Sequence, residues 1–308
     1  MPSSNDHTVP GFAPRCASDS AGPISLDEIL GLEKLDDLLF RSQSHSGTGP
    51  RLFGGQVAGQ AVMAAGHTSP KDRTIHSAHT HFLLPGDAST PVLYHVDPVR
   101  DGGSFTTRRV EAVQHGKVIF HLTASFQKPE LGISHQVPVL DAPGPDEIPP
   151  PEEQFRDDPE GLAWIRLLMS RNPVEFRFPD IPGRISVLRG QASPPRQSAW
   201  IRSTASLPDD DLHHAGALMY ISDLLLLSTA LGPHGLTIQD PNLQFATIDH
   251  TVWFHSPCRA DEWFLHDQES FWADSGRAVC RGSFFDQSGK LVATAIQEGL
   301  LRLRPAKR

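Results

Sequence analysis

The 308-residue sequence has few cysteines and no block of positive charge. Its three cysteines, Cys16, Cys258 and Cys280, are far apart and include no CxxC pair, which argues against a disulfide framework or a zinc cage. The chain carries 27 Lys and Arg against 36 Asp and Glu, a net charge of −9. Because nucleic-acid binding depends on neutralising phosphates, we expect no nucleic-acid partner.

The sequence also lacks an apolar run long enough to cross a membrane. Its longest apolar stretch, 217–231, is interrupted by Asp223 and is shorter than the roughly 20 residues that a bilayer requires. The N-terminal residues contain Pro, Ser and Asp but no apolar core of a signal peptide, so we expect a disordered arm over 1–24. The C-terminal RPAKR differs from the Ser-Lys-Leu type of peroxisomal address. These features favour a soluble protein of the cytoplasm.

Two segments have the pattern of helices. Residues 53–65 include a glycine pair and carry small and apolar residues at helical spacing. Residues 213–231 follow an acidic run at 209–211, which suits a helix start, and stop before a Gly-Pro pair. Segments between and after these helices are rich in β-branched and aromatic residues and are separated by Gly, Asp and Pro. They predict antiparallel strands.

The chain contains an internal repeat. Three pairs of identical residues are separated by 172 positions (254 − 82), and a Gly-Lys pair recurs at 173 (289 − 116). They are Phe82 and Phe254, Pro85 and Pro257, Arg109 and Arg281, and Gly116-Lys117 and Gly289-Lys290. Each pair occupies the same place in the order of elements, so the sequence predicts one helix-and-sheet unit that occurs twice.

A proline-rich acidic segment separates the two predicted units. Residues 138–151 read PVLDAPGPDEIPPP, a composition that disfavours a helix or a central strand. We therefore expect an N-terminal unit over 25–137, a linker over 138–158 and a C-terminal unit over 159–308.

Asp223 is the residue that is hardest to explain as part of a scaffold. On a helix, its neighbours three and four positions away are Met219, Tyr220, Leu226 and Leu227, so its carboxylate would point into an apolar face. A buried carboxylate needs donors around it, and its pKa rises where donors are few. Such a group suits a general base. The alternative is a structural acid bonded to a backbone N–H or to an arginine.

Two further polar residues lie in strand-like segments of the second unit. Period-2 alternation in 244–255 groups Thr247 with Asp249 and Thr251, so the Thr247 hydroxyl is a candidate for a site. Strands also favour Thr without any function. Gln297, in KLVATAIQEGL, offers an amide donor and acceptor, although a solvated Gln is equally ordinary.

Other groups point to no metal or cofactor. His76, His79 and His81 are close in sequence, but only His79 and His81 share a strand face, and no nearby Cys or acid completes a zinc site. The sequence contains no Gly-x-Ser-x-Gly elbow, phosphate loop or dinucleotide fingerprint. We therefore expect no metal, no cofactor and no covalent serine mechanism.

Comparison of the two repeats indicates a single site. With the 173 offset, Gln297 corresponds to Ala124 (297 − 173), and 51–66 contains no acid that would match Asp223. The second unit therefore has polar groups that the first lacks, which predicts one active site for each pair of units.

The motifs of the chain resemble those of the acyl-CoA thioesterase II family, the TesB type, over about residues 26–303. In the first half the resemblance rests on LFGGQVAGQA after Arg51, HFLLPGD at 81–87, RDGGSFTTRRVEAVQHGK at 100–117 and TASFQ at 123–127. In the second half it rests on YISDLLLL at 220–227, ATIDHTVWFH at 246–255 and ATAIQEGL at 293–300. The resemblance implies an α+β double hot-dog fold, in which each half wraps an antiparallel sheet around one long helix.

The resemblance also implies the site. In that family an Asp on the second helix, a Thr or Ser in a strand and a Gln in the last strand hold and polarise a water, and these residues correspond to Asp223, Thr247 and Gln297. The water attacks the thioester carbonyl of an acyl-CoA and releases a fatty acid and coenzyme A. Because a thiolate leaves with little protonation, a strong general acid is unnecessary. The N–H groups of Gly54-Gly55 are candidates for binding the oxyanion.

The expected partner is therefore an acyl-CoA substrate, and we expect a homo-oligomer. Coenzyme A is polyanionic while the chain carries a charge of −9, so we expect Arg108, Arg109, Arg277 or Arg281 to supply local positive charge. Strand arginines also commonly cover apolar surface with their stems.

Two other functions remain open. An enoyl-CoA hydratase of the same fold needs an Asp and a His on one face, whereas Asp249 and His250 point to opposite faces of an unbulged strand. A catalytically inert acyl-CoA-binding protein would be expected to lack at least one of the three polar residues, and all three are present.

Overall fold

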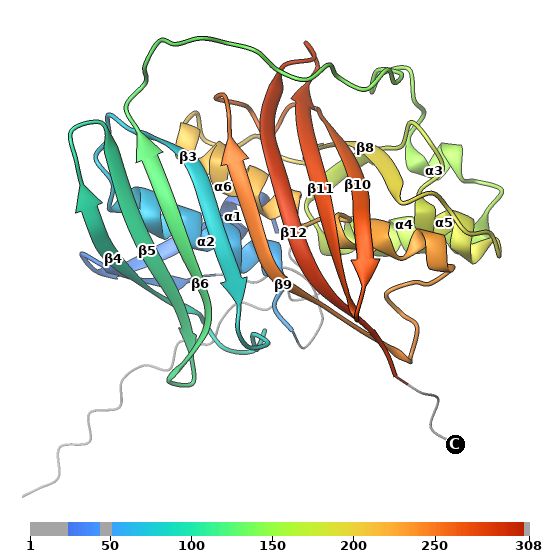
Figure 1. Ribbon diagram of the computed structural model, residues 1–308, viewed down its shortest axis with the longest axis horizontal. Coiled ribbons are helices and arrows are strands. Elements are labelled where there is room, and N and C mark those ends of the chain that lie inside the picture. Colours follow the sequence, from blue (N-terminus) through green and yellow to red (C-terminus); the bar gives the residue numbers. More distant parts are fainter. Residues whose placement is uncertain (1–23, 44–50, 305–308) are drawn as a thin grey trace, which may run out of the picture.

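The computed structural model describes residues 24–43 and 51–304, so the arm expected over 1–24 lies almost entirely outside the described residues. The described strands form one antiparallel sheet of twelve strands in the order β1-β2-β4-β5-β6-β3-β9-β12-β11-β10-β8-β7. Figure 1 shows this curved sheet with helices α2 and α6 side by side on one of its faces. This arrangement is the duplicated helix-and-sheet unit that the repeat predicts, and it agrees with the double hot-dog fold that the family resemblance implies.

The described part of the first half forms two helices and six strands. They are α1 (Leu26–Leu30), β1 (Leu32–Asp36), β2 (Leu39–Ser42), α2 (Gly54–His67), β3 (Thr74–Phe82), β4 (Leu93–Asp101), β5 (Phe105–Gln114) and β6 (Lys117–Gln127). Residues 128–150, which follow, contain no helix or strand and, in Figure 1, pass over the strand ends of the sheet from β6 toward α3.

The second half contains the remaining helices and strands. They are α3 (Pro151–Gln154), α4 (Pro159–Arg171), β7 (Val174–Arg177), α5 (Gly183–Leu188), β8 (Arg196–Ser203), α6 (Asp211–Ser222), the 3₁₀ turns η1 (Leu227–Ala230) and η2 (Gly232–His234), β9 (Leu243–Phe254), β10 (Phe264–Asp274), β11 (Arg277–Asp286) and β12 (Leu291–Leu303).

The repeat found in the sequence is present in the sheet. A shift of 172 positions carries β5 onto β11, because 105–114 becomes 277–286. At the centre of the sheet, His79 of β3 pairs with Thr251 of β9, and these two residues are themselves 172 positions apart. The two halves are therefore related by a local two-fold axis that passes between these paired residues.

Helices α2 and α6 cross at a pair of glycines. A Cβ atom on Gly59 would lie 2.8 Å from the carbonyl oxygen of Gly216, so neither helix has room for a side chain at the crossing. Gly59 costs its helix about 1 kcal/mol of intrinsic stability, which this close packing offsets. The crossing brings the start of α2 to the end of α6.

The first predicted helix is confirmed within two residues at its C-terminal end, whereas the second is wrong in extent. Helix α6 ends at Ser222 instead of continuing to Leu231, and the chain then passes through η1 and η2. The expectation that no apolar run is long enough to cross a membrane counted only 217–231; the longer stretch Asp211–His234 is long and apolar enough by composition, but 83% of its most apolar window is buried inside the protein. It is therefore a core segment. Its apolar pattern predicts correctly that the residues are buried, but it does not predict where the helix ends.

Candidate active site

Asp223 lies at the point where α6 stops. It is the C-cap residue of that helix, and Leu225, two positions further, has a φ of 66°. This left-handed conformation is strained for a leucine and costs roughly 1–3 kcal/mol. The Leu225 carbonyl accepts hydrogen bonds from Ser228 Oγ at 2.6 Å and from Gln197 Nε2 at 3.2 Å, which hold the turn. The break in the helix thus turns the carboxylate of Asp223 toward the neighbouring strands.

Asp223, Thr247 and Gln297 meet as the sequence analysis expects. Gln297 Nε2 donates to Asp223 Oδ1 at 2.5 Å and to Thr247 Oγ1 at 2.9 Å. The other oxygen, Asp223 Oδ2, accepts from the backbone N–H of Gly55 at 2.8 Å. One residue from each of α2, the end of α6, β9 and β12 therefore contributes to a single hydrogen-bonded group.

The orientation of Thr247 corrects the alternation assumed from the sequence. The pairing of β9 with β12 skips Ile248, because Asp249 pairs with Glu298 and Thr247 pairs with Gly299. This β-bulge reverses the face of the residues before it, so Thr247 does not share a face with Asp249. Its hydroxyl instead reaches the side chain of Gln297, which is fully buried in the next strand.

The surroundings of Asp223 alter its acidity. Burial raises the pKa of the Asp223 carboxyl above the ordinary aspartate value, and the hydrogen bonds from Gln297 and Gly55 offset part of that rise. A Cβ atom on Gly54 would lie 2.8 Å from Asp223 Oδ2, so the glycine pair allows the start of α2 to approach the carboxylate. The expected oxyanion donor at Gly55 is therefore wrong for this arrangement, because Gly55 N–H is bonded to Asp223.

An apolar cavity of about 450 Å³ opens beside the three residues. Asp223 and Thr247 line it, as do residues of α4 and of the segment after α6. Its apolar wall includes Trp164, Leu167, Leu168, Leu224, Leu227 and Leu231. The break at the end of α6 and the helices α4 and α5 thus form a pocket that suits a hydrocarbon chain next to the polar group.

The arginines expected to supply positive charge near the site are each occupied elsewhere. Arg108 pairs with Asp101 and also binds the backbone of Thr68. The other three are likewise paired with carboxylates, Arg109 with Asp97, Arg277 with Glu298 and Arg281 with Glu269. None of the four lines the cavity beside Asp223, so the structure adds no support to this expectation.

The histidines do not form a metal site. Within residues 24–43 and 51–304, no group of three or more His, Cys, Asp or Glu side chains has the geometry to hold a metal ion. His79 packs edge-on against Trp253, and His81 lies 5.1 Å from His121 between ring centroids.

The first half has a counterpart of the site without its chemistry. At the helix crossing, Gly59 of α2 occupies the place that Gly216 occupies in α6, an offset of 157 positions (216 − 59). The same offset makes Gly66 the counterpart of Asp223, and Gly55 the counterpart of Leu212. The sheet repeat relates Ile75 to Thr247 and Ala124 to Gln297, and β3 repeats the bulge, since its pairing with β6 skips the residue after Ile75. The architecture is therefore duplicated, whereas the polar group is present once.

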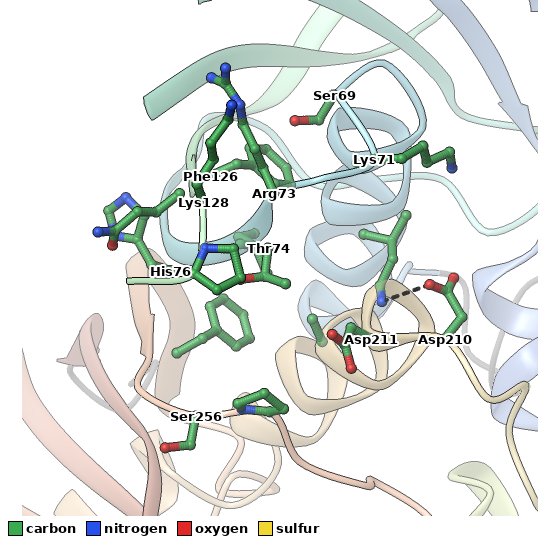
Figure 2. Close-up of a pocket in the computed structure, with 18 of the residues that line it drawn as sticks. Ser69, Lys71, Arg73, Thr74, His76, Phe126, Lys128, Asp210, Asp211 and Ser256 are labelled. Carbon is green, nitrogen blue, oxygen red and sulfur yellow. Dashed lines mark hydrogen bonds between the residues drawn. The ribbon is translucent and has the colours of Figure 1, made fainter. Parts of the chain in front are cut away.

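A pocket of about 650 Å³ lies at that counterpart position. Figure 2 shows it between β3, which carries Thr74 and His76, and the start of α6, where Asp210 and Asp211 lie. The side chain of Leu212 occupies the space next to Gly66, since a Cβ atom there would lie 2.2 Å from Leu212 Cδ1. Among the described residues, the hydrogen-bonded group of Asp223, Thr247 and Gln297 accompanies the cavity of the second half and has no equivalent at the counterpart pocket.

Sequence reasoning missed a buried pair directly behind the site. Ser222, the last residue of α6, donates to the carbonyl of Met219 at 2.8 Å, and its Oγ lies 2.7 Å from His250 Nε2. His250 is fully buried and pairs with Gln297 in the sheet. The pair therefore ties the end of α6 to the strand that carries Thr247. The adjacent Asp249-His250 pair draws attention in the sequence as a possible functional group, but the sequence does not show that the His250 imidazole is buried in the core.

Comparisons with known proteins agree with this site. A family model described as acyl-CoA thioesterase matches residues 169–300, and one described as acyl-CoA thioesterase N-terminal domain matches 42–127. The chain is 38% identical to acyl-CoA thioesterase 2 of Haemophilus influenzae, over 90% of this chain and 97% of that protein. It is 39% identical to acyl-coenzyme A thioesterase 8 of Homo sapiens, over 90% and 88%. Among solved structures, it is similar to an acyl-CoA thioesterase II, TesB2, from Mycobacterium marinum, with a TM-score of 0.73, 40% identity and coverage of 92% and 99%.

Proposed function

Because the chain belongs to the acyl-CoA thioesterase family and is an acyl-CoA thioesterase, we propose that Asp223, Thr247 and Gln297 perform the hydrolysis. The observation that supports this assignment is the Gln297 amide, which bonds both Asp223 and Thr247 at the end of an apolar pocket. The products are a free fatty acid and coenzyme A.

Asp223 acts as the general base. Each of its two oxygens accepts one hydrogen bond from the protein, which leaves lone pairs on the carboxylate for a water proton. The raised pKa makes this carboxylate a stronger base than an ordinary aspartate. The water adds to the thioester carbonyl, its proton passes to Asp223, and the C–S bond breaks as the thiolate leaves.

Thr247 and Gln297 have different tasks. The Thr247 hydroxyl accepts from Gln297, so its own proton is free to orient the water or the substrate carbonyl. Gln297 uses both protons of its amide on Asp223 and Thr247, so it fixes the distance between base and hydroxyl. The water is then held by Asp223 and Thr247, and Gln297 sets their geometry.

A panel of acyl-CoAs of increasing chain length, with detection of the free thiol, tests the activity. We expect turnover of acyl-CoAs whose chains fill the apolar pocket, and loss of most turnover in Asp223→Asn. Acyl-CoA binding without release of thiol by the wild-type protein would instead support an inert binding protein.

Direct attack by water leaves no acyl group on the protein. Mass spectrometry of the intact chain, quenched during turnover, should therefore show no acyl adduct, and heavy-oxygen water should label the fatty acid in a single turnover. An acyl ester on Thr247 would show that its hydroxyl is the nucleophile, while the thioesterase activity would stand.

We further propose that the enzyme acts in the cytoplasm, in lipid metabolism, and as a homo-oligomer. The acyl-CoA chemistry and the composition of the chain support the first two. Light scattering coupled to size-exclusion chromatography tests the assembly, with the mass of one 33.7-kDa chain as the contrary result.

A further inference from the structure

The cavity beside Asp223 has an excess of positive charge. Three arginines, Arg51, Arg171 and Arg184, are among the residues that line it, and Asp223 is the one acidic residue in its described lining. This balance is opposite in sign to that of the whole chain, which carries a charge of −9.

The three arginines come from separate elements around the cavity. Arg51 lies three residues before α2, where its backbone bridges to Asp87, and Arg171 is the last residue of α4. Arg184 belongs to α5, where its guanidinium lies 5.8 Å from the Trp164 ring centroid. The fold therefore brings residues from three distant parts of the sequence into the lining of one cavity.

None of these three arginines is neutralised by the part of the chain that the structure describes. No carboxylate among residues 24–43 and 51–304 forms an ion pair with any of them, in contrast to the paired Arg108 and Arg277. Arg184 binds the side-chain oxygen of Gln239, and its buried Nε has no hydrogen-bond partner. Arg184 is half-buried, whereas Arg51 and Arg171 are exposed at the rim of the cavity lining. Guanidinium groups that have no counter-ion within the described residues are suited to an anionic ligand.

We propose that Arg51, Arg171 and Arg184 form a phosphate-binding subsite for the nucleotide end of coenzyme A. This inference rests on the proposed function, since it places the thioester at Asp223. A diphosphate and a 3′-phosphate offer several oxygens to planar guanidinium groups, which bind phosphate through paired N–H donors. The leucine-lined part of the cavity then receives the acyl chain, and the arginines hold the opposite end of the substrate.

Substrates that differ only in their phosphates test the subsite. Arg51→Gln, Arg171→Gln and Arg184→Gln are assayed with an acyl-CoA and with the pantetheine thioester of the same acid, which has no phosphate. We expect each variant to raise the KM for the acyl-CoA about tenfold and to leave kcat and the pantetheine thioester unaffected. The wild-type KM for the acyl-CoA should also rise with salt, and less steeply in the variants.

Arg166→Gln is the matched control. Arg166 is exposed on α4, lies outside the cavity lining and forms no ion pair with any residue of 24–43 or 51–304, so its replacement removes the same charge from the helix that carries Arg171. It should change the KM for neither substrate. Equal losses on both thioesters in the cavity variants, or equal effects in Arg166→Gln, would overturn the subsite.

A binding measurement separates this inference from the proposed function. Adenosine 3′,5′-bisphosphate, titrated by calorimetry, should bind the wild-type protein and bind each cavity variant about tenfold more weakly. Equal affinity in wild type and variants refutes the subsite. Absence of thioester hydrolysis by a wild type that binds the nucleotide refutes the proposed function and leaves the subsite supported.

Discussion

The backbone N–H of Gly55 lies 2.8 Å from Oδ2 of Asp223 and joins the first turn of α2 to the residue that ends α6. Because α2 belongs to the first half and α6 to the second, the site depends on how the halves pack together. The second half supplies the carboxylate, the hydroxyl and the amide, and the first half supplies the N–H that fixes the carboxylate. The duplicated fold therefore makes one site from two units.

Gly55→Ala should damage both packing and catalysis. A Cβ atom at this position would lie 2.5 Å from the carbonyl oxygen of Tyr220 and 2.6 Å from the Phe53 ring, so α2 must shift away from α6. We expect the free energy of unfolding to fall by about 1–3 kcal/mol and kcat to fall as well. Gly132→Ala is the control, because a Cβ atom there meets nothing within 4 Å. Wild-type kcat in Gly55→Ala would show that its N–H does not position Asp223.

Asp223→Asn should lower kcat by about 10²–10⁴-fold, because the amide cannot take the proton of the water. In the wild type, kcat/KM should fall as the pH drops through the raised pKa of Asp223, and the residual activity of the variant should lack this limb. Kinetics measured across pH with both proteins check the assignment. Near-normal turnover in a folded variant would remove Asp223 from the mechanism.

The Asp223→Asn variant should also show how much the buried carboxylate lowers the free energy of unfolding. Because the folded-state pKa of Asp223 is raised, the folded state keeps the proton at pH values where the unfolded state has lost it. Stability of the wild type relative to Asp223→Asn should therefore fall as the pH rises from about 4 through the folded-state pKa, and then become constant. A difference that does not change with pH would contradict the raised pKa.

Thr247→Ala and Gln297→Ala should each lower kcat, and their effects should not multiply in the double variant. Both residues belong to one hydrogen-bonded group, so the loss of Gln297 already releases Thr247 from its place. A double-mutant cycle on kcat measures this coupling, which we expect to be about 0.5–3 kcal/mol. Independent losses would mean that the two side chains act on different steps.

The sequence predicted the duplicated architecture because repeats and strand patterns record which faces are buried. It could not predict the end of α6. Leu224, Leu226 and Leu231 are buried whether the segment is a helix or a pair of 3₁₀ turns, so their apolar pattern is the same in both. The stop depends on the strained turn at Leu225, which is held by residues distant in the sequence, among them Gln197.

The sequence predicted which residues meet at the site, but it did not predict the direction in which the Thr247 side chain points. A β-bulge has no signal in a run of strand-forming residues, so alternation placed Thr247 on the wrong face. The charge of the pocket was equally hidden, because Arg51, Arg171 and Arg184 are gathered from three elements only when the chain folds. The arginines in the strand motifs, Arg108, Arg109, Arg277 and Arg281, are easier to single out in the sequence, but in the structure each is paired with a carboxylate.

His250 should make the protein sensitive to acid. Burial lowers the pKa of its imidazole to about 3, whereas an unfolded histidine has a pKa of about 6.5. Between these two values the unfolded state binds a proton that the folded state does not, so stability falls as the pH drops through this window. Ser222 donates its own proton to Met219, so His250 Nε2 must be the donor between His250 and Ser222, which agrees with a neutral ring.

His250→Gln tests this account through the pH dependence of unfolding. The variant should be less stable than the wild type at pH 7, because it loses the packed ring and the bond that holds the end of α6. That difference in the free energy of unfolding should shrink as the pH falls from about 6.5 toward 3. Only in the wild type does protonation of His250 in the unfolded state lower the stability of the folded state. Replacement of the exposed His135 serves as the control for the loss of a histidine that has no buried contacts. A constant difference between His250→Gln and wild type across this range would mean that His250 does not contribute to acid unfolding, and that the acid sensitivity arises from other groups such as the equally buried His266.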